Sequence, residues 1–166
     1  FSMYLTATNF FLSGHNPYLA SAPQVYPPAF LFIMTPFAVL PVEVARALWT
    51  TLSLVSFFLA LHFLLKHFSL KTKVFLGLLA LQLFPVKYAL AQGQINFFVF
   101  LGFVLLYRFF TQKKDFLAGL TLALITIMKL NPVLLVIYFL VLKKYRLVIC
   151  FFATFMLLNL LIDTSS

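Results

Sequence analysis

The 166-residue chain has few charged residues: 9% are Asp, Glu, Lys or Arg, and only three are acidic. Soluble globular proteins carry about 25% charged residues, so this chain has too few polar side chains to cover a water-facing surface. Its one cysteine, Cys150, excludes an internal disulfide or a cysteine-based metal cluster. Glycine-rich nucleotide loops, Cys/His metal spacings and Ser/His/Asp sets are also absent. We therefore expect neither a metal nor a cofactor.

Hydrophobic residues make up 64% of the chain, with 23 Phe and a mean hydropathy of +1.08. This composition excludes intrinsic disorder and predicts a polytopic, all-α membrane protein. Since the chain begins with Phe1 and shows no signal peptide, we interpret it as a fragment of a longer multi-pass protein of the inner or plasma membrane. In such a protein the net charge of +9 indicates orientation rather than a nucleic-acid partner.

Nine of the twelve basic residues fall in three clusters: Lys66, Lys71, Lys73; Arg108, Lys113, Lys114; and Lys143, Lys144, Arg146. Such clusters in short loops mark the cytoplasmic side of a membrane. The chain then crosses the membrane an even number of times between clusters. Residues 43–166 are predicted to form a bundle of about six short transmembrane helices, at about 44–66, 74–90, 95–108, 116–129, 132–142 and 146–162.

The break within residues 116–142 is predicted at Asn131-Pro132, because proline removes a helical N–H and disfavours helical geometry in the preceding residue. One continuous, kinked helix over 116–142 is the alternative. It places the last basic cluster on the outside, against the charge rule.

Residues 1–42 carry no Lys, Arg, Asp or Glu and are predicted to form an extracytoplasmic loop. An amphipathic helix is expected from Met3 to Leu12, followed by a loop at residues 14–18. A second helix, Ala29 to Leu40, follows Pro28 and is too short to span, so we expect a juxtamembrane or re-entrant element.

This topology places three isolated cations, Arg46, Lys87 and Lys129, on the extracytoplasmic side together with Gln94, Asn96 and Asn131. Only Glu43 and Asp163 are acidic on that side, so the pattern favours an anionic ligand such as a lipid phosphate. Each of the three cations, taken alone, is also explained if its long side chain extends its charged group to the lipid headgroups. The amides of Gln94 and Asn96 are equally explained as caps of the helix that follows them.

The chain resembles the polyprenol-phosphate-mannose-dependent alpha-mannosyltransferases of glycosyltransferase family 87, which have the multi-span C-type glycosyltransferase fold. The resemblance rests on an ordered series of motifs: Tyr4, residues 14–18 (GHNPY), 26–28 (YPP), 36–41 (PFAVLP), 47–49 (ALW), 93–96 (GQIN), 118–120 (AGL), 129–132 (KLNP) and 143–146 (KKYR). The series covers nearly all of the chain.

The resemblance implies inverting transfer of a mannose-like hexose from a polyprenyl-phosphate donor to a glycan or glycolipid acceptor at the extracytoplasmic face. The catalytic Asp of the family aligns just before Phe1, so the chain itself is expected to lack it. Arg46, Lys87 and Lys129 are the expected phosphate ligands, with Gln94, Asn96 and Asn131 as amide contacts, while Asn16, Tyr18 and Tyr26 are expected to shape the sugar or acceptor pocket. A component of a lipid-linked sugar flippase and a non-catalytic membrane subunit are the alternatives.

Overall fold

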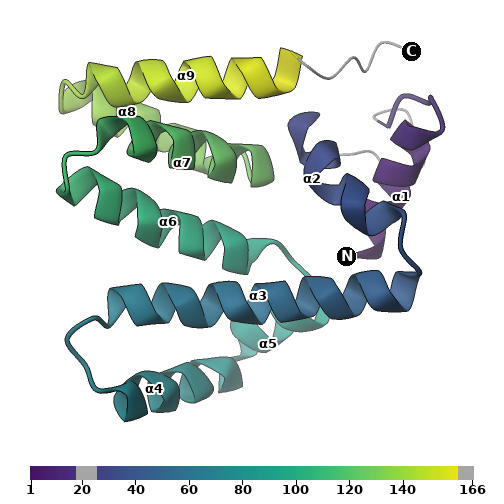
Figure 1. Ribbon diagram of the computed structural model, residues 1–166, viewed down its shortest axis with the longest axis horizontal. Coiled ribbons are helices and arrows are strands. Elements are labelled where there is room, and N and C mark those ends of the chain that lie inside the picture. Colours follow the sequence, from purple (N-terminus) through teal and green to yellow (C-terminus); the bar gives the residue numbers. More distant parts are fainter. Residues whose placement is uncertain (18–25, 161–166) are drawn as a thin grey trace.

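A computed structural model of the chain describes residues 1–17 and 26–160. These residues form helices and turns without β-strands, which confirms the all-α prediction (Figure 1). In chain order the helices are α1 (Ser2–Leu12), α2 (Ala29–Ala38), α3 (Val42–Leu64), α4 (Leu70–Gln82), α5 (Phe84–Ala91), α6 (Asn96–Thr111), α7 (Asp115–Met128), the 3-10 helix η1 (Asn131–Leu134), α8 (Leu135–Val141) and α9 (Tyr145–Leu160).

Helix α7 packs between α6 and α9, and α6 packs in turn on α3 (Figure 1). The contact between α7 and α9 is close at Gly119, where an added Cβ would lie 2.5 Å from the carbonyl oxygen of Leu147. Gly119 is in the second turn of α7 and Leu147 in the first turn of α9. The two helices therefore begin side by side.

The chain reverses direction after α7 and again after α8 (Figure 1). Lys129 ends α7 in an extended conformation (φ −152°, ψ 125°), and η1 begins two residues later with Pro132 in its first turn. Helix α8 then leads back to the end of the bundle where α7 started (Figure 1). Residues 116–142 thus form two separate helical segments rather than one kinked helix, because Asn131-Pro132 prevents α7 from continuing.

The segment expected as one helix over 74–90 is divided. Helices α4 and α5 meet at Leu83 with a bend of 77°, and Leu83 itself is extended (φ −66°, ψ 134°). Pro85 lies in the first turn of α5, a position where proline is tolerated because no helical N–H is needed there.

The N-terminal helices α1 and α2 pack against each other beside the first half of α3 (Figure 1). Their shared core contains Tyr4, Phe30, Met34, Trp49 and Ile127, which are all nearly inaccessible to solvent. This cluster joins α1 and α2 to α3 and to the end of α7. Its residues Tyr4 and Ile95 also line the cavity described below.

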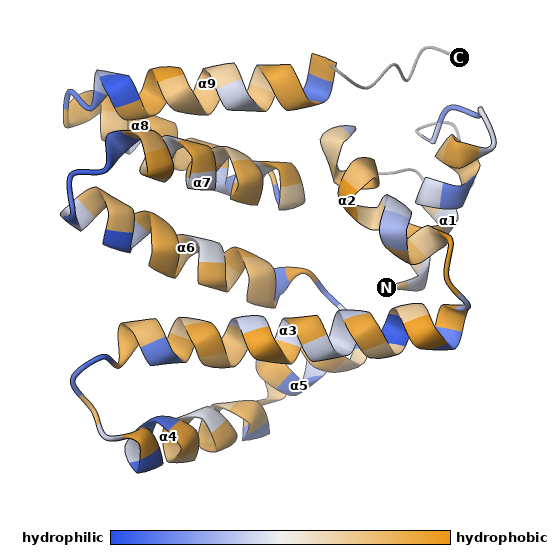
Figure 2. Cartoon of the chain, viewed as in Figure 1, coloured by the Kyte–Doolittle hydropathy of each residue, from blue (hydrophilic) through white to orange (hydrophobic). Residues whose placement is uncertain are grey.

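Most helix surfaces are apolar (Figure 2), but few of the helices are long. Among the described residues, α3 is the one unbroken helix long and apolar enough to span a bilayer, and the bent pair of α4 and α5 passes the same test when taken together. The other apolar helices have 10–17 residues, shorter than the roughly 20 that an untilted span requires. Six transmembrane helices are therefore not confirmed by helix length.

The loops divide between the two ends of the bundle. Those joining α3 to α4, α6 to α7 and α8 to α9 lie at one end, at the left in Figure 1, and the three basic clusters lie in these loops and in the adjoining turns of the helices. The turns before α3, before α6 and after α7 lie toward the other end. The structure thus separates the basic clusters from the amide-rich turns, and the membrane side on which each end lies stays a prediction.

Candidate functional site

An open cavity of about 490 Å³ lies where the start of α1 meets the turn before α6 and the end of α7. It is larger than a phosphate group requires and falls within the usual range of small-ligand sites. The residues that line it are Phe1, Ser2, Met3, Tyr4, Tyr26, Gln92, Gln94, Ile95, Asn96 and Lys129.

Lys129 takes part in a short chain of polar contacts on the wall of this cavity. Its Nζ donates a hydrogen bond to Oδ1 of Asn96 over 3.1 Å, and Nδ2 of Asn96 donates to Oε1 of Gln94 over 2.6 Å. The extended backbone at Lys129 carries its side chain out of α7 and across to the first residue of α6. Because one amide orients the next, the ammonium group is held at a defined place in the wall.

The structure does not support helix capping by Gln94 or Asn96. The N-cap of α6 is Ile95, and no side-chain capping hydrogen bond is made at the start of that helix by the residues that the structure describes. The two amides instead form the polar surface of the cavity, together with Lys129.

Two tyrosines lie on the wall beside α1. The hydroxyl groups of Tyr4 and Tyr26 are 3.3 Å apart, and their rings meet edge to face with centroids 5.4 Å apart. Burial raises the pKa of the Tyr4 phenol, and the hydrogen bond to Tyr26 raises it further. The Tyr4 phenol therefore stays protonated at physiological pH, so its hydroxyl group is available for hydrogen bonding.

A second cavity, of about 230 Å³, adjoins the first and is lined by Arg46, Trp49 and Gly93 among others. Phe1, Ser2 and Gln92 line both cavities. Neither set of lining residues includes an acidic side chain, so the paired cavities contain the cations Lys129 and Arg46 without a counter-charge from their own walls. An anion is the ligand that this arrangement favours.

Trp49 connects this second cavity to the polar chain. Its Nε1 donates a hydrogen bond to the carbonyl oxygen of Gly93 over 2.9 Å, and the indole is 2% exposed. Gly93 has φ +60°, a conformation that favours glycine, and the turn that it forms leads directly into Gln94 and Asn96. The buried indole thus positions the turn that carries both amides.

The predicted site residues fall into three groups. Tyr26, Gln94, Asn96 and Lys129 line the larger cavity, and Arg46 lines the smaller one. Lys87 is exposed on α5, Asn131 is exposed at the start of η1, and Asn16 is half-buried in the segment after α1; none of the three lines either cavity. Tyr18 lies outside the described residues.

Sequence reasoning did not place Tyr4 and Trp49 in the site, although both belong to the ordered motifs of the resemblance. Tyr4 reaches the larger cavity because it lies at the N-terminal end of α1, and Trp49 lines the smaller cavity and holds Gly93, a residue 44 positions away. No local pattern indicates either contact. The motif series of the family resemblance was the only feature of the sequence that pointed to these two residues.

Comparison with family models finds a match to glycosyltransferase family 87 over residues 25–165. Neither the comparison with curated proteins nor that with solved structures found a match. The matched range includes every cavity residue from Tyr26 to Lys129, whereas α1 and its Tyr4 precede it. Because the match covers most of the sequence, the chain belongs to glycosyltransferase family 87, whose members are membrane proteins.

Proposed function

We propose that this chain forms the donor-binding part of a membrane glycosyltransferase that moves a mannose-like hexose from a polyprenyl-phosphate donor to an acceptor hydroxyl, with inversion, at the extracytoplasmic face. Family membership supports the transferase class. The observation that carries the donor class is the ammonium group of Lys129, oriented by Asn96 in a cavity whose lining includes no carboxylate.

A polyprenyl-phosphate sugar places a negatively charged phosphate next to the anomeric carbon. When the acceptor oxygen attacks that carbon, the bond from the carbon to the phosphate oxygen breaks and its electron pair leaves with the polyprenyl phosphate. Lys129 stabilises the charge that develops on the phosphate, and the amides of Gln94 and Asn96 supply hydrogen bonds beside it. A phosphate leaving group needs no general acid.

The acceptor hydroxyl loses its proton to a general base as it attacks. The family resemblance supplies this base as an Asp just before Phe1. Phe1 and Ser2 line both cavities, so a carboxylate attached there is well placed to reach an acceptor between the Lys129 wall and Arg46. Tyr26 and its partner Tyr4 then contact the hexose, whereas Asn16 and Asn131, which line neither cavity, are assigned no contact.

Arg46 is the second cation of the proposal. It lines the smaller cavity, which adjoins the larger one through Gln92, so it contributes positive potential to the same donor phosphate. Lys87 is exposed on α5 and lines neither cavity. The proposal therefore assigns the phosphate to Lys129 and Arg46 rather than to all three isolated cations.

The proposal is tested by the choice of donor. The full-length protein, reconstituted in lipid nanodiscs with a mannoside acceptor, is expected to transfer hexose from polyprenyl-phosphate mannose and not from a nucleotide-linked mannose. A radiolabelled sugar on either donor makes the product measurable. Transfer from the nucleotide donor alone would contradict the proposal, and a β-linked donor should give an α-linked product if the reaction inverts.

A further inference from the structure

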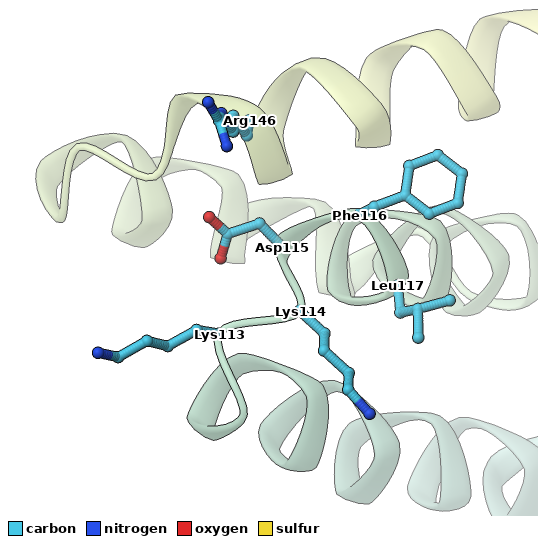
Figure 3. Close-up of a pocket in the computed structure, with 6 residues that line it drawn as sticks. All are labelled: Lys113, Lys114, Asp115, Phe116, Leu117 and Arg146. Atoms are coloured by element: carbon cyan, nitrogen blue, oxygen red, sulfur yellow. The ribbon is translucent and has the colours of Figure 1, made fainter.

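The end of the bundle opposite the candidate site has two cavities of its own. One, of about 500 Å³, is lined by Lys113, Lys114, Asp115, Phe116, Leu117 and Arg146. The other, of about 490 Å³, is lined by Asp115, Leu142, Lys143, Lys144, Tyr145 and Arg146. Asp115 and Arg146 line both, so the two cavities meet between the loop before α7 and the start of α9. Figure 3 shows the residues that line the first cavity.

The walls of these cavities carry five basic side chains and one acidic side chain. In the described part of the chain, the acid forms one ion pair, between Oδ1 of Asp115 and Nζ of Lys144 at 3.7 Å. The other four cations form no ion pair within the described residues. Figure 3 shows Lys113 and Lys114 leaving the loop in different directions, with Asp115 at the start of α7 and Arg146 on α9 above it in this view.

The backbone adds to this positive potential. Helices α7 and α9 begin side by side, and Lys114, the N-cap of α7, makes no side-chain capping hydrogen bond within the described part of the chain. Two adjacent helix N-termini each contribute roughly half a positive charge. The ligand that the cations and the helix ends together favour is an anion with several acceptor oxygens, such as a phosphate ester.

Apolar side chains adjoin the cationic walls. Phe116 lines the first cavity and is 68% exposed, and Tyr145 lines the second and is 57% exposed. Val141 and Ile149, on the helices that flank the second cavity, are 75% and 68% exposed. A free phosphate has no apolar part that would contact these surfaces, whereas a phospholipid has acyl chains that would pack against them.

We propose that the loop before α7 and the loop before α9 form a binding site for the phosphate headgroup of an anionic phospholipid, separate from the donor cavity at the opposite end of the bundle. The basic side chains hold the headgroup phosphate, and the exposed aromatic and aliphatic side chains contact the acyl chains. The site selects lipids by headgroup charge and takes no part in sugar transfer.

The proposal is tested with the full-length protein in detergent, by native mass spectrometry with dioleoylphosphatidylglycerol and dioleoylphosphatidylcholine as probes. The wild-type protein is expected to bind the anionic lipid more tightly. The triple variant K113Q/K114Q/R146Q is expected to raise the dissociation constant of phosphatidylglycerol about tenfold or more, since each of the three basic residues near a lipid surface contributes a factor of about five.

The matched control is K66Q/K71Q/K73Q, which removes three charges from the other basic cluster at the same end of the bundle. It is expected to leave the dissociation constant nearly unchanged. An equal loss in both triple variants would overturn the proposal in favour of a general surface charge effect. Equal affinity for phosphatidylcholine would overturn it too, as would displacement of the lipid by inorganic phosphate, which would identify a free phosphate as the ligand. The single variant Arg146→Gln, which should weaken binding in the same direction, serves if the triple variant does not fold.

Discussion

Replacing Lys129 with glutamine in the full-length protein is expected to lower kcat/KM for transfer from polyprenyl-phosphate mannose about 10²- to 10³-fold, the usual cost of removing one oriented electrostatic contact to a developing charge. The ammonium group lies in the cavity wall 3.1 Å from Oδ1 of Asn96. Glutamine is one atom shorter than lysine but keeps a hydrogen-bonding end, and it removes the charge. The measurement is steady-state transfer of a radiolabelled sugar in nanodiscs.

The control for this variant is Lys71→Gln, which removes the same charge from the opposite end of the bundle, where α4 begins. Its kcat/KM is expected to stay within about twofold of the wild type. Both proteins should show the same thermal unfolding midpoint as the wild type. If Lys129→Gln retains full activity, Lys129 does not stabilise the donor phosphate.

The variant Trp49→Phe is expected to lower kcat/KM about tenfold to a hundredfold, because it removes the Nε1–H that holds the Gly93 carbonyl and so lets the turn move. Displacing a catalytic contact by about 1 Å costs on the order of a hundredfold. Phenylalanine keeps most of the apolar packing in the cluster around Tyr4 and Phe98, whose rings contact the indole at centroid distances of 6.0 and 4.8 Å. Transfer kinetics check this result.

Phe37→Leu is the matched control for packing. The Phe37 ring and the Trp49 indole meet edge to face with centroids 5.3 Å apart, but Phe37 does not line either cavity. It should lower thermal stability while leaving kcat/KM close to that of the wild type.

Trp49 holds the turn that carries Asn96, and Asn96 in turn orients Lys129. The double variant W49F/K129Q should therefore lose less activity than the product of the two single losses. Fully multiplicative losses would show that Trp49 acts independently of the polar chain.

The positions of most helices were predictable from the sequence because breaks in an apolar chain have few causes. The helix predicted from Met3 to Leu12 forms as α1, and the one predicted to begin at Ala29 forms as α2. The break before Pro132 follows from the missing N–H of proline. In each case a short stretch of sequence contains the whole physical cause.

The bend at Leu83 was not predicted as a division of the segment 74–90. The turn was expected further along the chain, from Pro85 onward, but proline is equally acceptable in the first turn of a new helix, and α5 uses it in that way. The lengths of the apolar helices likewise do not confirm six membrane crossings. A helix of 10–17 apolar residues fits either a short span or a helix buried in the bundle.

The candidate site was predictable in its residue types but not in its pairings. Isolated cations among apolar residues indicated an anion site, and two of the three, Lys129 and Arg46, line adjoining cavities. The contact between Lys129 and Asn96 joins residues 33 positions apart, and that between Tyr4 and Tyr26 joins residues 22 apart. These contacts depend on how the helices rotate against one another, which hydrophobic periodicity alone does not determine.

The most direct test of the central claim, that the cavity around Lys129 holds the donor phosphate, is the binding of sugar-free polyprenyl phosphate to the full-length protein. Native mass spectrometry of the wild type and of Lys129→Gln at equal lipid concentrations gives the two dissociation constants. We predict a value at least about tenfold higher for the variant, with Lys71→Gln matching the wild type. Equal binding by all three proteins would contradict the account.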